Sequence, residues 1–241
     1  MYREKHIRSI IKTISWRITA TITTFSLVWI FTGQLGTAFA IGGIEVFLKM
    51  FLYYLHERFW DKAKLGRVEV APFVLWFTGL PVSGKTSLAD AMYEELKKNG
   101  RKVERLDGEK VRQLFPQTGF SKKERILHIE RIGHLSSILV KHNIIVVASF
   151  ISPYAESRQF ARQLSTNFIE IYINTPLEVC EKRDTKGLYL RARKGEIKQF
   201  TGIDAPYEEP KNPEIIVDTS SIASEENVKK IMKYIKNRNL V

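Results

Sequence analysis

Two long apolar runs open the chain, and a regular alternation of short apolar segments with amphipathic segments follows them. Residues 14–32 and 36–55 are almost entirely apolar or hydroxyl-bearing, with the short uncharged turn 33–36 between them. Each run is close to the ~20 residues that a helix needs to cross a bilayer. The pattern therefore predicts a transmembrane helical hairpin, with residues 14–55 in contact with the lipid bilayer.

Basic residues flank this hairpin at both outer ends. They are Arg3, Lys5, Arg8 and Lys12 before it, and Arg58, Lys62, Lys64 and Arg67 after it. Because cytoplasmic loops carry an excess of Lys and Arg, both ends of the hairpin and the domain that follows are expected on the cytoplasmic side. This interpretation predicts a multi-pass protein of the cytoplasmic membrane with both termini facing the cytoplasm.

Three charged residues interrupt the apolar runs, where an isolated charge is costly. Glu45 and Lys49 are four residues apart in the order that favours pairing on one helix face, and Arg17 is close enough to a helix end to reach the interface. The alternative is an amphipathic hairpin that lies on the membrane or packs on the following domain. The segment 15–58 also resembles a small bacterial family of two-helix membrane domains of unknown function.

The remainder of the chain alternates strands with helices. The expected strands are 73–78, 102–106, 143–148, 168–173 and 215–218, and the expected helices are 87–96, 121–142, 156–164, 176–183 and 225–235. Such alternation favours right-handed crossovers and a parallel sheet covered by helices on both faces. We therefore expect an α/β domain in residues 68–241, preceded by an all-α membrane-anchoring hairpin and linker in residues 1–67.

The segment 79–86, Gly-Leu-Pro-Val-Ser-Gly-Lys-Thr, fits the phosphate-binding pattern GxxxxGK[ST] between an expected strand and an expected helix. Glycines let successive N–H groups curl around phosphates, Lys85 adds a positive charge, and the Thr86 hydroxyl can ligate Mg²⁺. The pattern predicts an ATP site in a P-loop NTPase-type fold. The residues expected to hold the nucleotide are Gly79, Leu80, Pro81, Val82, Ser83, Gly84, Lys85, Thr86 and Ser87.

The formal net charge of +12 favours anionic partners, namely nucleotides, nucleic acid or a lipid surface. Residues 1–70 carry ten Lys and Arg against five Asp and Glu, and residues 71–241 carry 28 against 21, so the charge is spread along the chain. Zinc-finger spacing and RRM-like aromatic motifs are absent from the sequence, and no nucleic-acid partner is expected. The single cysteine, Cys180, excludes an intrachain disulfide and lies in an apolar helical pattern typical of a core position.

Downstream of the P-loop, a long series of segments resembles the adenylylsulfate kinases (APS kinases). These enzymes transfer the γ-phosphate of ATP to the 3′-hydroxyl of adenosine 5′-phosphosulfate (APS), and so make 3′-phosphoadenylyl sulfate for sulfate assimilation or sulfation. The resemblance covers residues 73–219. The segments that carry it are 106–108, 111–112, 119–121, Arg125, 150–154, 168–170, 174–184, 186–189, 195–198, 200–204 and 206–208.

The resemblance implies roles for individual residues. It also implies ATP and Mg²⁺ as cofactors and APS as substrate, and it is compatible with a homodimer. The adenine of the substrate would lie between Phe120 and Phe200, and the guanidinium groups of Arg112 and Arg125 suit a phosphosulfate. Arg183 would cover ATP. Catalytic roles fall to Lys85, Asp107, Glu109 and Ser152, metal binding to Thr86 and Asp107, and substrate binding to Arg112, Phe120, Arg125, Ile151, Ser152, Pro153, Lys198 and Phe200.

The chain departs from the family pattern at several positions. Glu109 and Lys110 replace an Asp-Asn pair, and His128 and Glu130 replace an Asn and an Arg on the long helix. Residues 81–83 also replace the usual small residues of the P-loop. A diverged kinase that acts on another nucleotide or small anionic alcohol, and a nucleotide-binding regulatory or scaffold protein, are therefore the alternatives to an APS kinase.

Overall fold

The computed structural model describes residues 2–4, 10–16, 18–20, 23, 30, 37–63, 67–69, 71–116, 118–221 and 224–240. Its backbone divides into two compact units, an N-terminal unit of residues 1–70 and a C-terminal unit of residues 71–241.

The N-terminal unit contains a long helix, α2 (Thr37–Lys62), and two short strands, β1 (Tyr2–Glu4) and β2 (Arg67–Glu69). The strands pair antiparallel, which the apolar pattern did not predict. Helical residues at 10–16 pack against the C-terminal half of α2, since the ring of Trp16 meets that of Tyr53 edge-on at 5.1 Å. Most of the run 14–32, including Arg17, and the Glu45 side chain lie outside the described residues.

The expected pair of membrane-spanning helices is not found in the part of the chain that the structure describes. Among these residues, no helix is both long enough and apolar enough to cross a membrane. The helix α2 continues to Lys62, beyond the expected end at residue 55, and its last turns contain Glu57, Arg58 and Asp61.

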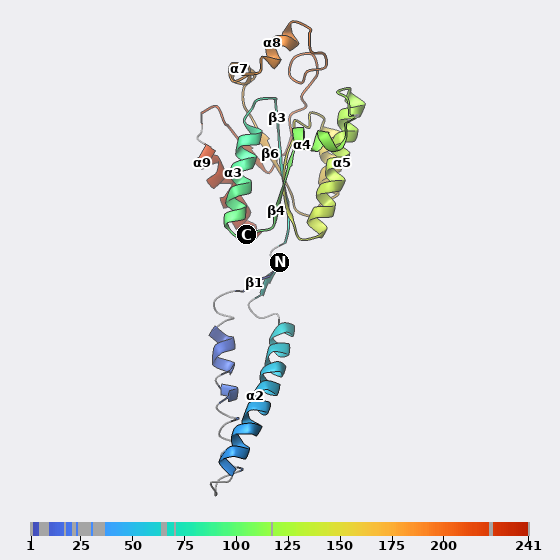
Figure 1. Ribbon diagram of the computed structural model, residues 1–241. Coiled ribbons are helices and arrows are strands. Elements are labelled where there is room, and N and C mark those ends of the chain that lie inside the picture. Colours follow the sequence, from blue (N-terminus) through green and yellow to red (C-terminus); the bar gives the residue numbers. More distant parts are fainter. Residues whose placement is uncertain are drawn as a thin grey trace. The chain divides into compact units, whose positions relative to one another are not determined.

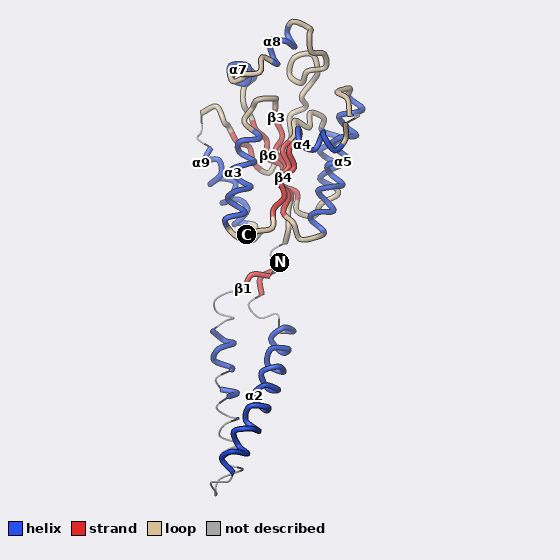
Figure 2. The backbone as a smooth tube through the Cα atoms, viewed as in Figure 1, coloured by secondary structure: helices blue, strands red, loops and turns tan. Residues whose placement is uncertain are grey.

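The C-terminal unit is built on five parallel strands in the order β4-β5-β3-β6-β7 (Figure 2). The strands are β3 (Val74–Gly79), β4 (Val103–Asp107), β5 (Ile145–Ser149), β6 (Phe168–Ile173) and β7 (Ile215–Val217). All six residues of β3 and of β6 are buried, as expected for strands covered on both faces. This parallel sheet agrees with the expected α/β fold.

Helices cover both faces of this sheet (Figure 1). Alternate residues of β3 point to opposite faces: Leu75 and Phe77 join a core with α3 (Lys85–Lys98) and α9 (Ser224–Asn237), whereas Trp76 packs with α5 (Lys122–Lys141) and α6 (Ala155–Gln163). The apolar stripes of these helices thus supply two separate cores, one on each side of the sheet.

Short helices at the carboxyl edge of the sheet complete the unit. They are α4 (Gly108–Leu114), α7 (Leu177–Lys182) and α8 (Leu188–Arg193). Of these, α4 and α8 were not expected from the apolar pattern. The helix α4 begins because the Asp107 side chain accepts a hydrogen bond from the Glu109 N–H and caps it. In the register of the sheet, Asp107 pairs with Ser149 and Ser149 with Phe77, so three strands end side by side.

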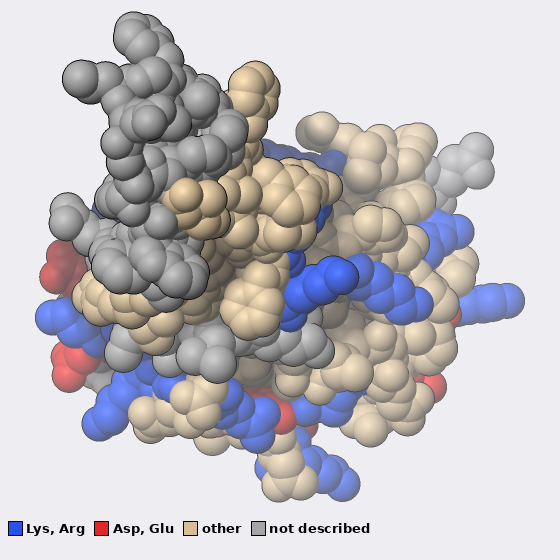
Figure 3. Space-filling view, turned by 90° about the horizontal axis from the view of Figure 1, so that it is seen from below, with Lys and Arg blue, Asp and Glu red and all other residues tan. Residues whose placement is uncertain are grey.

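Charged side chains are spread over the described surface. In the view of Figure 3, Lys and Arg side chains lie scattered among uncharged residues, with acidic side chains near several of them. Exposed pairs include Lys122 with Glu156 at 3.5 Å and Arg191 with Glu196 at 3.3 Å. The distribution matches the dispersed charge of the sequence.

Candidate active site

The P-loop, residues 79–86, follows β3 and curls tightly before α3 begins. A Cβ on Gly79 would lie 2.8 Å from the Ile173 carbonyl oxygen, so only glycine fits there. Gly84 has a φ of 87°, in the left-handed region that favours glycine. No side chain caps the first turn of α3, which leaves its N–H groups and the positive end of its dipole for a ligand. The loop is therefore shaped for phosphate.

Side chains behind the P-loop hold its backbone. The Thr219 hydroxyl donates to the Ser83 carbonyl oxygen at 2.8 Å, and the Thr175 hydroxyl lies 3.2 Å from the same oxygen. Arg183 donates to Thr219 Oγ1 and to its carbonyl oxygen at 3.1 and 2.7 Å. From the opposite side, the Tyr189 hydroxyl of α8 donates to the Pro81 carbonyl oxygen at 2.9 Å. Arg183 thus contacts the P-loop through Thr219.

Lys85, at the start of α3, is buried although it carries an ionisable group. Its Nζ donates to the Leu80 carbonyl oxygen and, at 3.3 Å, to Ser83 Oγ. Burial lowers the pKa of Lys85 to about 8, and the nearby Cys180 and Asp107 oppose this shift. A phosphate would supply the anionic partner that the buried ammonium group requires.

A cavity of about 390 Å³ opens beside Lys85, at the carboxyl edge of the sheet. It brings together many of the predicted site residues: Pro81, Val82, Lys85, Thr86, Asp107, Glu109, Arg112, Phe120, Arg125, Ile151, Ser152 and Pro153. The other predicted residues do not line it: Gly79, Leu80, Ser83, Gly84, Ser87, Arg183, Lys198 and Phe200. Ligands of parallel α/β folds gather at this edge.

Two oxygen-bearing side chains in the cavity suit a magnesium ion. The Thr86 hydroxyl and the Asp107 carboxylate both line it, and Mg²⁺ prefers one or two such protein ligands together with phosphates and waters. No group of three or more His, Cys, Asp or Glu side chains gathers for a metal within the described residues. The Thr86 hydroxyl and the Asp107 carboxylate therefore fit a Mg²⁺ ion that is also bound by the phosphates of the nucleotide. Glu109 is exposed at the rim of the same cavity.

An aromatic ring with two guanidinium groups close to it also lines the cavity. The Arg112 guanidinium carbon lies 4.3 Å from the centre of the Phe120 ring, and that of Arg125 lies 5.4 Å from it. Burial lowers the pKa of both arginines from the ordinary value, yet both stay charged at neutral pH. This wall, formed by Arg112, Phe120 and Arg125, combines positive charge with an aromatic side chain that is 56% exposed.

Arg125 also joins two loops that are far apart in the sequence. Its Nε donates to the Phe120 carbonyl oxygen at 2.7 Å, and its Nη2 donates to the Gln199 carbonyl oxygen at 2.6 Å. Its Nη1 donates to Thr201 Oγ1 at 3.1 Å. Arg125 thereby ties the loop that carries Phe200 to the loop that carries Phe120. The Phe200 ring itself packs edge-on against Tyr189, at 5.0 Å between centres.

The comparison with protein families identifies the family to which the C-terminal unit belongs. The family model described as adenylylsulphate kinase matches residues 71–218, which is more than half of the chain. The chain belongs to the adenylylsulphate kinase family. A second model, described as a predicted membrane protein (DUF2061), matches residues 10–61. The APS kinase unit and the N-terminal unit therefore match two different families.

Individual relatives agree with this assignment. An adenylyl-sulfate kinase from Picosynechococcus sp. is 52% identical over 160 residues, which are 66% of this chain and 90% of the relative. One from Halothermothrix orenii is 46% identical over 168 residues, 69% of this chain and 91% of the relative. The identity to these adenylyl-sulfate kinases indicates that the chain is an ATP-dependent kinase.

Solved APS kinases share the fold. The Mycobacterium tuberculosis APS kinase CysC in complex with AMPPNP and APS superposes with a TM-score of 0.67 and is 36% identical, covering 70% of this chain and 99% of that one. A hexameric APS kinase from Thiobacillus denitrificans has a TM-score of 0.56 and 29% identity, covering 72% of this chain and 30% of that one.

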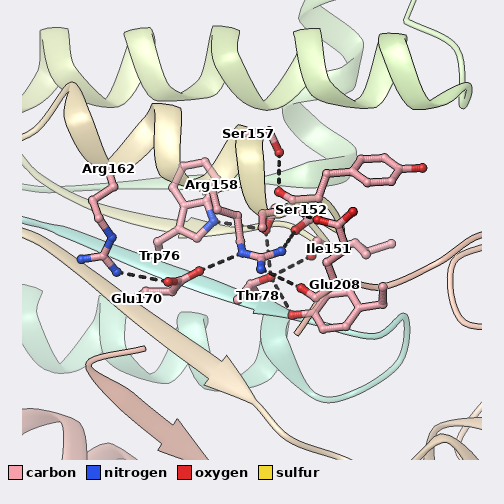
Figure 4. Close-up of polar contacts among 12 residues, drawn as sticks. Trp76, Thr78, Ile151, Ser152, Ser157, Arg158, Arg162, Glu170 and Glu208 are labelled. Carbon is pink, nitrogen blue, oxygen red and sulfur yellow. Dashed lines mark hydrogen bonds and ion pairs between the residues drawn. The ribbon is translucent and has the colours of Figure 1, made fainter. Parts of the chain in front are cut away.

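Within this APS kinase fold, the Ser152 hydroxyl is hydrogen-bonded to two neighbouring side chains (Figure 4). It accepts a hydrogen bond from Trp76 Nε1 at 3.2 Å and donates to Thr78 Oγ1 at 2.9 Å. The Thr78 hydroxyl donates in turn to the Ile151 carbonyl oxygen at 2.8 Å. The side chain thus fixes the cavity wall 151–153, and its hydroxyl proton is already committed to Thr78.

His128 is a site residue of this APS kinase that the sequence patterns did not assign. It lines the cavity, is only 3% exposed, and packs edge-on to Phe115 and Phe150. Neither ring nitrogen has a hydrogen-bond partner among the described residues. Burial and the charges of Arg112 and Arg131 lower its pKa to about 4, so the ring is neutral at pH 7. The sequence held one signal for it, because His128 stands where the family pattern has an Asn on this helix, and the structure places it on the buried face of α5.

Proposed function

We propose that the C-terminal unit is an adenylylsulfate kinase that transfers the γ-phosphate of ATP to the 3′-hydroxyl of APS. The observation that carries the proposal is a single cavity shared by Lys85 and Thr86 of the P-loop, Asp107, and the Arg112–Phe120 wall. One side of this cavity suits the phosphates of a nucleotide, and the other suits a second, aromatic and anionic molecule. The solved relative described with AMPPNP and APS supports both ligands.

In this proposal the P-loop residues bind and orient the donor nucleotide. The N–H groups at the start of α3 would hold the phosphates, and the phosphate charge would stabilise the ammonium form of Lys85. Thr86 and Asp107 would hold Mg²⁺, which neutralises the charge of the transferring group. Positioning and charge neutralisation account for most of the catalysis of phosphoryl transfer.

The acceptor would lie against the opposite wall. The Phe120 side chain, which is 56% exposed, would contact its base, while Arg112 would bring positive charge to its phosphosulfate. The neutral ring of His128 offers one N–H donor and one acceptor nitrogen to an uncharged group of the acceptor. Glu109, at the rim, is proposed to orient the attacking hydroxyl and to receive its proton.

Acceptor-dependent ADP release tests the proposal. The full-length protein is assayed with Mg-ATP, with and without APS, beside the Lys85→Ala variant. We expect turnover that depends on APS and disappears in Lys85→Ala. Turnover with another nucleotide or a small anionic alcohol but not with APS would establish the diverged kinase, and ATP binding without turnover on any acceptor would establish the regulatory or scaffold protein.

We also propose that the N-terminal unit attaches the kinase to a lipid bilayer, at its cytoplasmic side. The match to a predicted membrane protein supports this. Exposed apolar side chains also support it, because their exposure to water is unfavourable and contact with lipid would remove that free-energy cost. They are Ile10, Ile14, Ile18, Ile30, Phe47, Met50, Phe51, Leu55 and Phe59. The basic residues at both flanks would face anionic headgroups.

Fractionation tests this attachment. The full-length chain is expected in the membrane fraction, and a chain without residues 1–67 in the soluble fraction. Release of the full-length chain by alkaline carbonate would identify a hairpin that lies on the surface, whereas retention would identify a spanning one. Recovery of the full-length chain in the soluble fraction without detergent would refute the attachment.

Self-association as a homodimer is part of the same proposal. The description of a similar solved structure as a hexameric APS kinase supports association between copies. Size-exclusion chromatography with light scattering measures the mass of the particle. A monomer at micromolar concentration would contradict this part alone.

A further inference from the structure

Arg158 is a buried arginine whose donors reach three different parts of the C-terminal unit. It lies on α6, is 3% exposed, and its Nε is 2.9 Å from the Glu170 carboxylate of β6. Its Nη1 donates to the Ser152 carbonyl oxygen at 2.7 Å, and its Nη2 donates to the Glu208 carbonyl oxygen at 2.6 Å. Figure 4 shows Arg158 between Glu170 and Ser152. A planar guanidinium group is suited to such divergent contacts, and a lysine is not.

The first of these carbonyl groups belongs to the wall of the acceptor cavity. Ser152 has a φ of 39°, a conformation that a residue other than glycine adopts only when its surroundings hold it. Trp76 and Thr78 hold its side chain, and Arg158 holds its carbonyl group. Removing one of these contacts frees the backbone to relax, and the adjoining Ile151 and Pro153 would move with it.

The second carbonyl group belongs to the end of the lid segment, defined as residues 184–213. The Glu208 N–H donates to the Pro153 carbonyl oxygen at 2.8 Å, and the Tyr207 and Thr78 hydroxyls are 2.9 Å apart. Nearer its start, the lid segment contacts the P-loop through Tyr189 and Pro81. The segment is therefore attached to the P-loop at one end and to the acceptor wall at the other.

We infer that Arg158 is a positioning residue for phosphoryl transfer, because it fixes the acceptor wall at Ser152 and the end of the lid segment at Glu208 relative to each other. Arg158 does not line the cavity in which both ligands are proposed to lie. Its effect passes through the Ile151–Pro153 wall, against which the acceptor is proposed to lie, so the inference rests on the proposed function. Small misplacements of a bound acceptor reduce rates steeply.

Arg162, one turn further along α6, is a matched control. It also pairs with Glu170, at 3.1 Å, and with Glu214, at 2.5 Å. Both of these partners lie outside the cavity wall and outside the lid segment. Replacing either arginine by lysine keeps a positive charge beside Glu170, but only Arg158→Lys gives up the two-pronged contact with the Ser152 and Glu208 carbonyl groups.

The experiment compares Arg158→Lys with Arg162→Lys in the full-length protein. For each variant we measure kcat and KM for APS, the affinity for a non-hydrolysable ATP analogue without acceptor, and the melting temperature. We expect Arg158→Lys to reduce kcat/KM for APS at least about tenfold, and Arg162→Lys to change it less than about threefold. Nucleotide affinity is expected to stay within about twofold in both.

Equal values of kcat/KM for APS in the two variants, with folded protein in both cases, would overturn the inference. If Arg158→Lys does not fold, Tyr207→Phe tests the same link, because it removes only the hydroxyl that joins the lid segment to Thr78. We expect a smaller loss in the same direction, and an unchanged kcat/KM would again overturn the inference. Absence of APS-dependent turnover in the unmodified protein would instead refute the proposed function, which separates the two failures.

Discussion

The Tyr189 hydroxyl of α8 donates a hydrogen bond to the Pro81 carbonyl oxygen of the P-loop, although 108 positions separate the two residues. Tyr189 is almost fully buried, and the Phe200 ring packs against it edge-on. The contact places a helix of the lid segment directly on the loop that is shaped for phosphate. Loss of this contact should therefore change nucleotide binding.

Tyr189→Phe tests this contact. The variant keeps the ring and removes one hydrogen bond, and it leaves the Pro81 carbonyl group without this donor. Since a net hydrogen bond contributes about 1 kcal/mol, we expect the affinity for ATP to fall about fivefold. Isothermal titration calorimetry with a non-hydrolysable ATP analogue measures it. Tyr93→Phe, on the partly exposed side of α3, is the control and should leave the affinity unchanged.

Nucleotide binding should take up a proton through Lys85. Its pKa is about 8 in the unliganded protein because the ammonium group is buried, so above pH 8 the amine is mostly neutral. Bound phosphates raise this pKa, and the proton is then taken from solvent. Near pH 8.5, where the free amine is about three quarters neutral, we expect uptake of a large fraction of a proton.

Calorimetry in buffers of different ionisation enthalpy measures this uptake. Lys85→Arg is the matched variant, because a guanidinium group stays protonated throughout this range. It should bind nucleotide without proton uptake. Uptake of the same size in Lys85→Arg would assign the proton to another group.

His128→Leu separates stability from acceptor recognition. The substitution removes two buried ring nitrogens that have no partner among the described residues, so the melting temperature should stay level or rise. If the acceptor pairs with these nitrogens, its KM should rise roughly tenfold while the affinity for ATP is unchanged. Steady-state kinetics with APS and thermal unfolding measure the two effects. A KM for APS equal to that of the unmodified protein would show that His128 only packs.

Glu109 should be required for turnover but not for nucleotide binding. Its carboxylate lies at the rim of the cavity, and general base catalysis typically contributes about a hundredfold or more. We expect Glu109→Gln to lower kcat by about a hundredfold and to leave ATP affinity unchanged. Glu109→Asp, which keeps the charge, should lose less. Single-turnover rates with APS would reveal the difference, and a normal rate in Glu109→Gln would exclude the role.

Local sequence patterns were sufficient for much of this protein. The apolar strand before Gly79 and the helix that starts at Lys85 specified the P-loop, since its chemistry depends on neighbours in sequence and on the backbone freedom of glycine. The alternation of strands and helices was sufficient to predict the parallel sheet. The spacing of apolar residues differs between strands and helices, so it shows which segment forms which element. The pattern did not predict α4, because its apolar spacing is weak. The helix begins there because the Asp107 side chain caps it.

Contacts between distant segments required the tertiary structure. Phe200 and Arg183 carry site-like chemistry in the sequence, yet the fold places them outside the cavity, while it places His128 inside with both ring nitrogens unpartnered. The hydrogen bonds that the Ser152 hydroxyl makes with Trp76 and Thr78 also became visible only in the fold. Sequence patterns report period and propensity along the chain, whereas burial and hydrogen-bond partners across more than a hundred residues depend on how the layers pack.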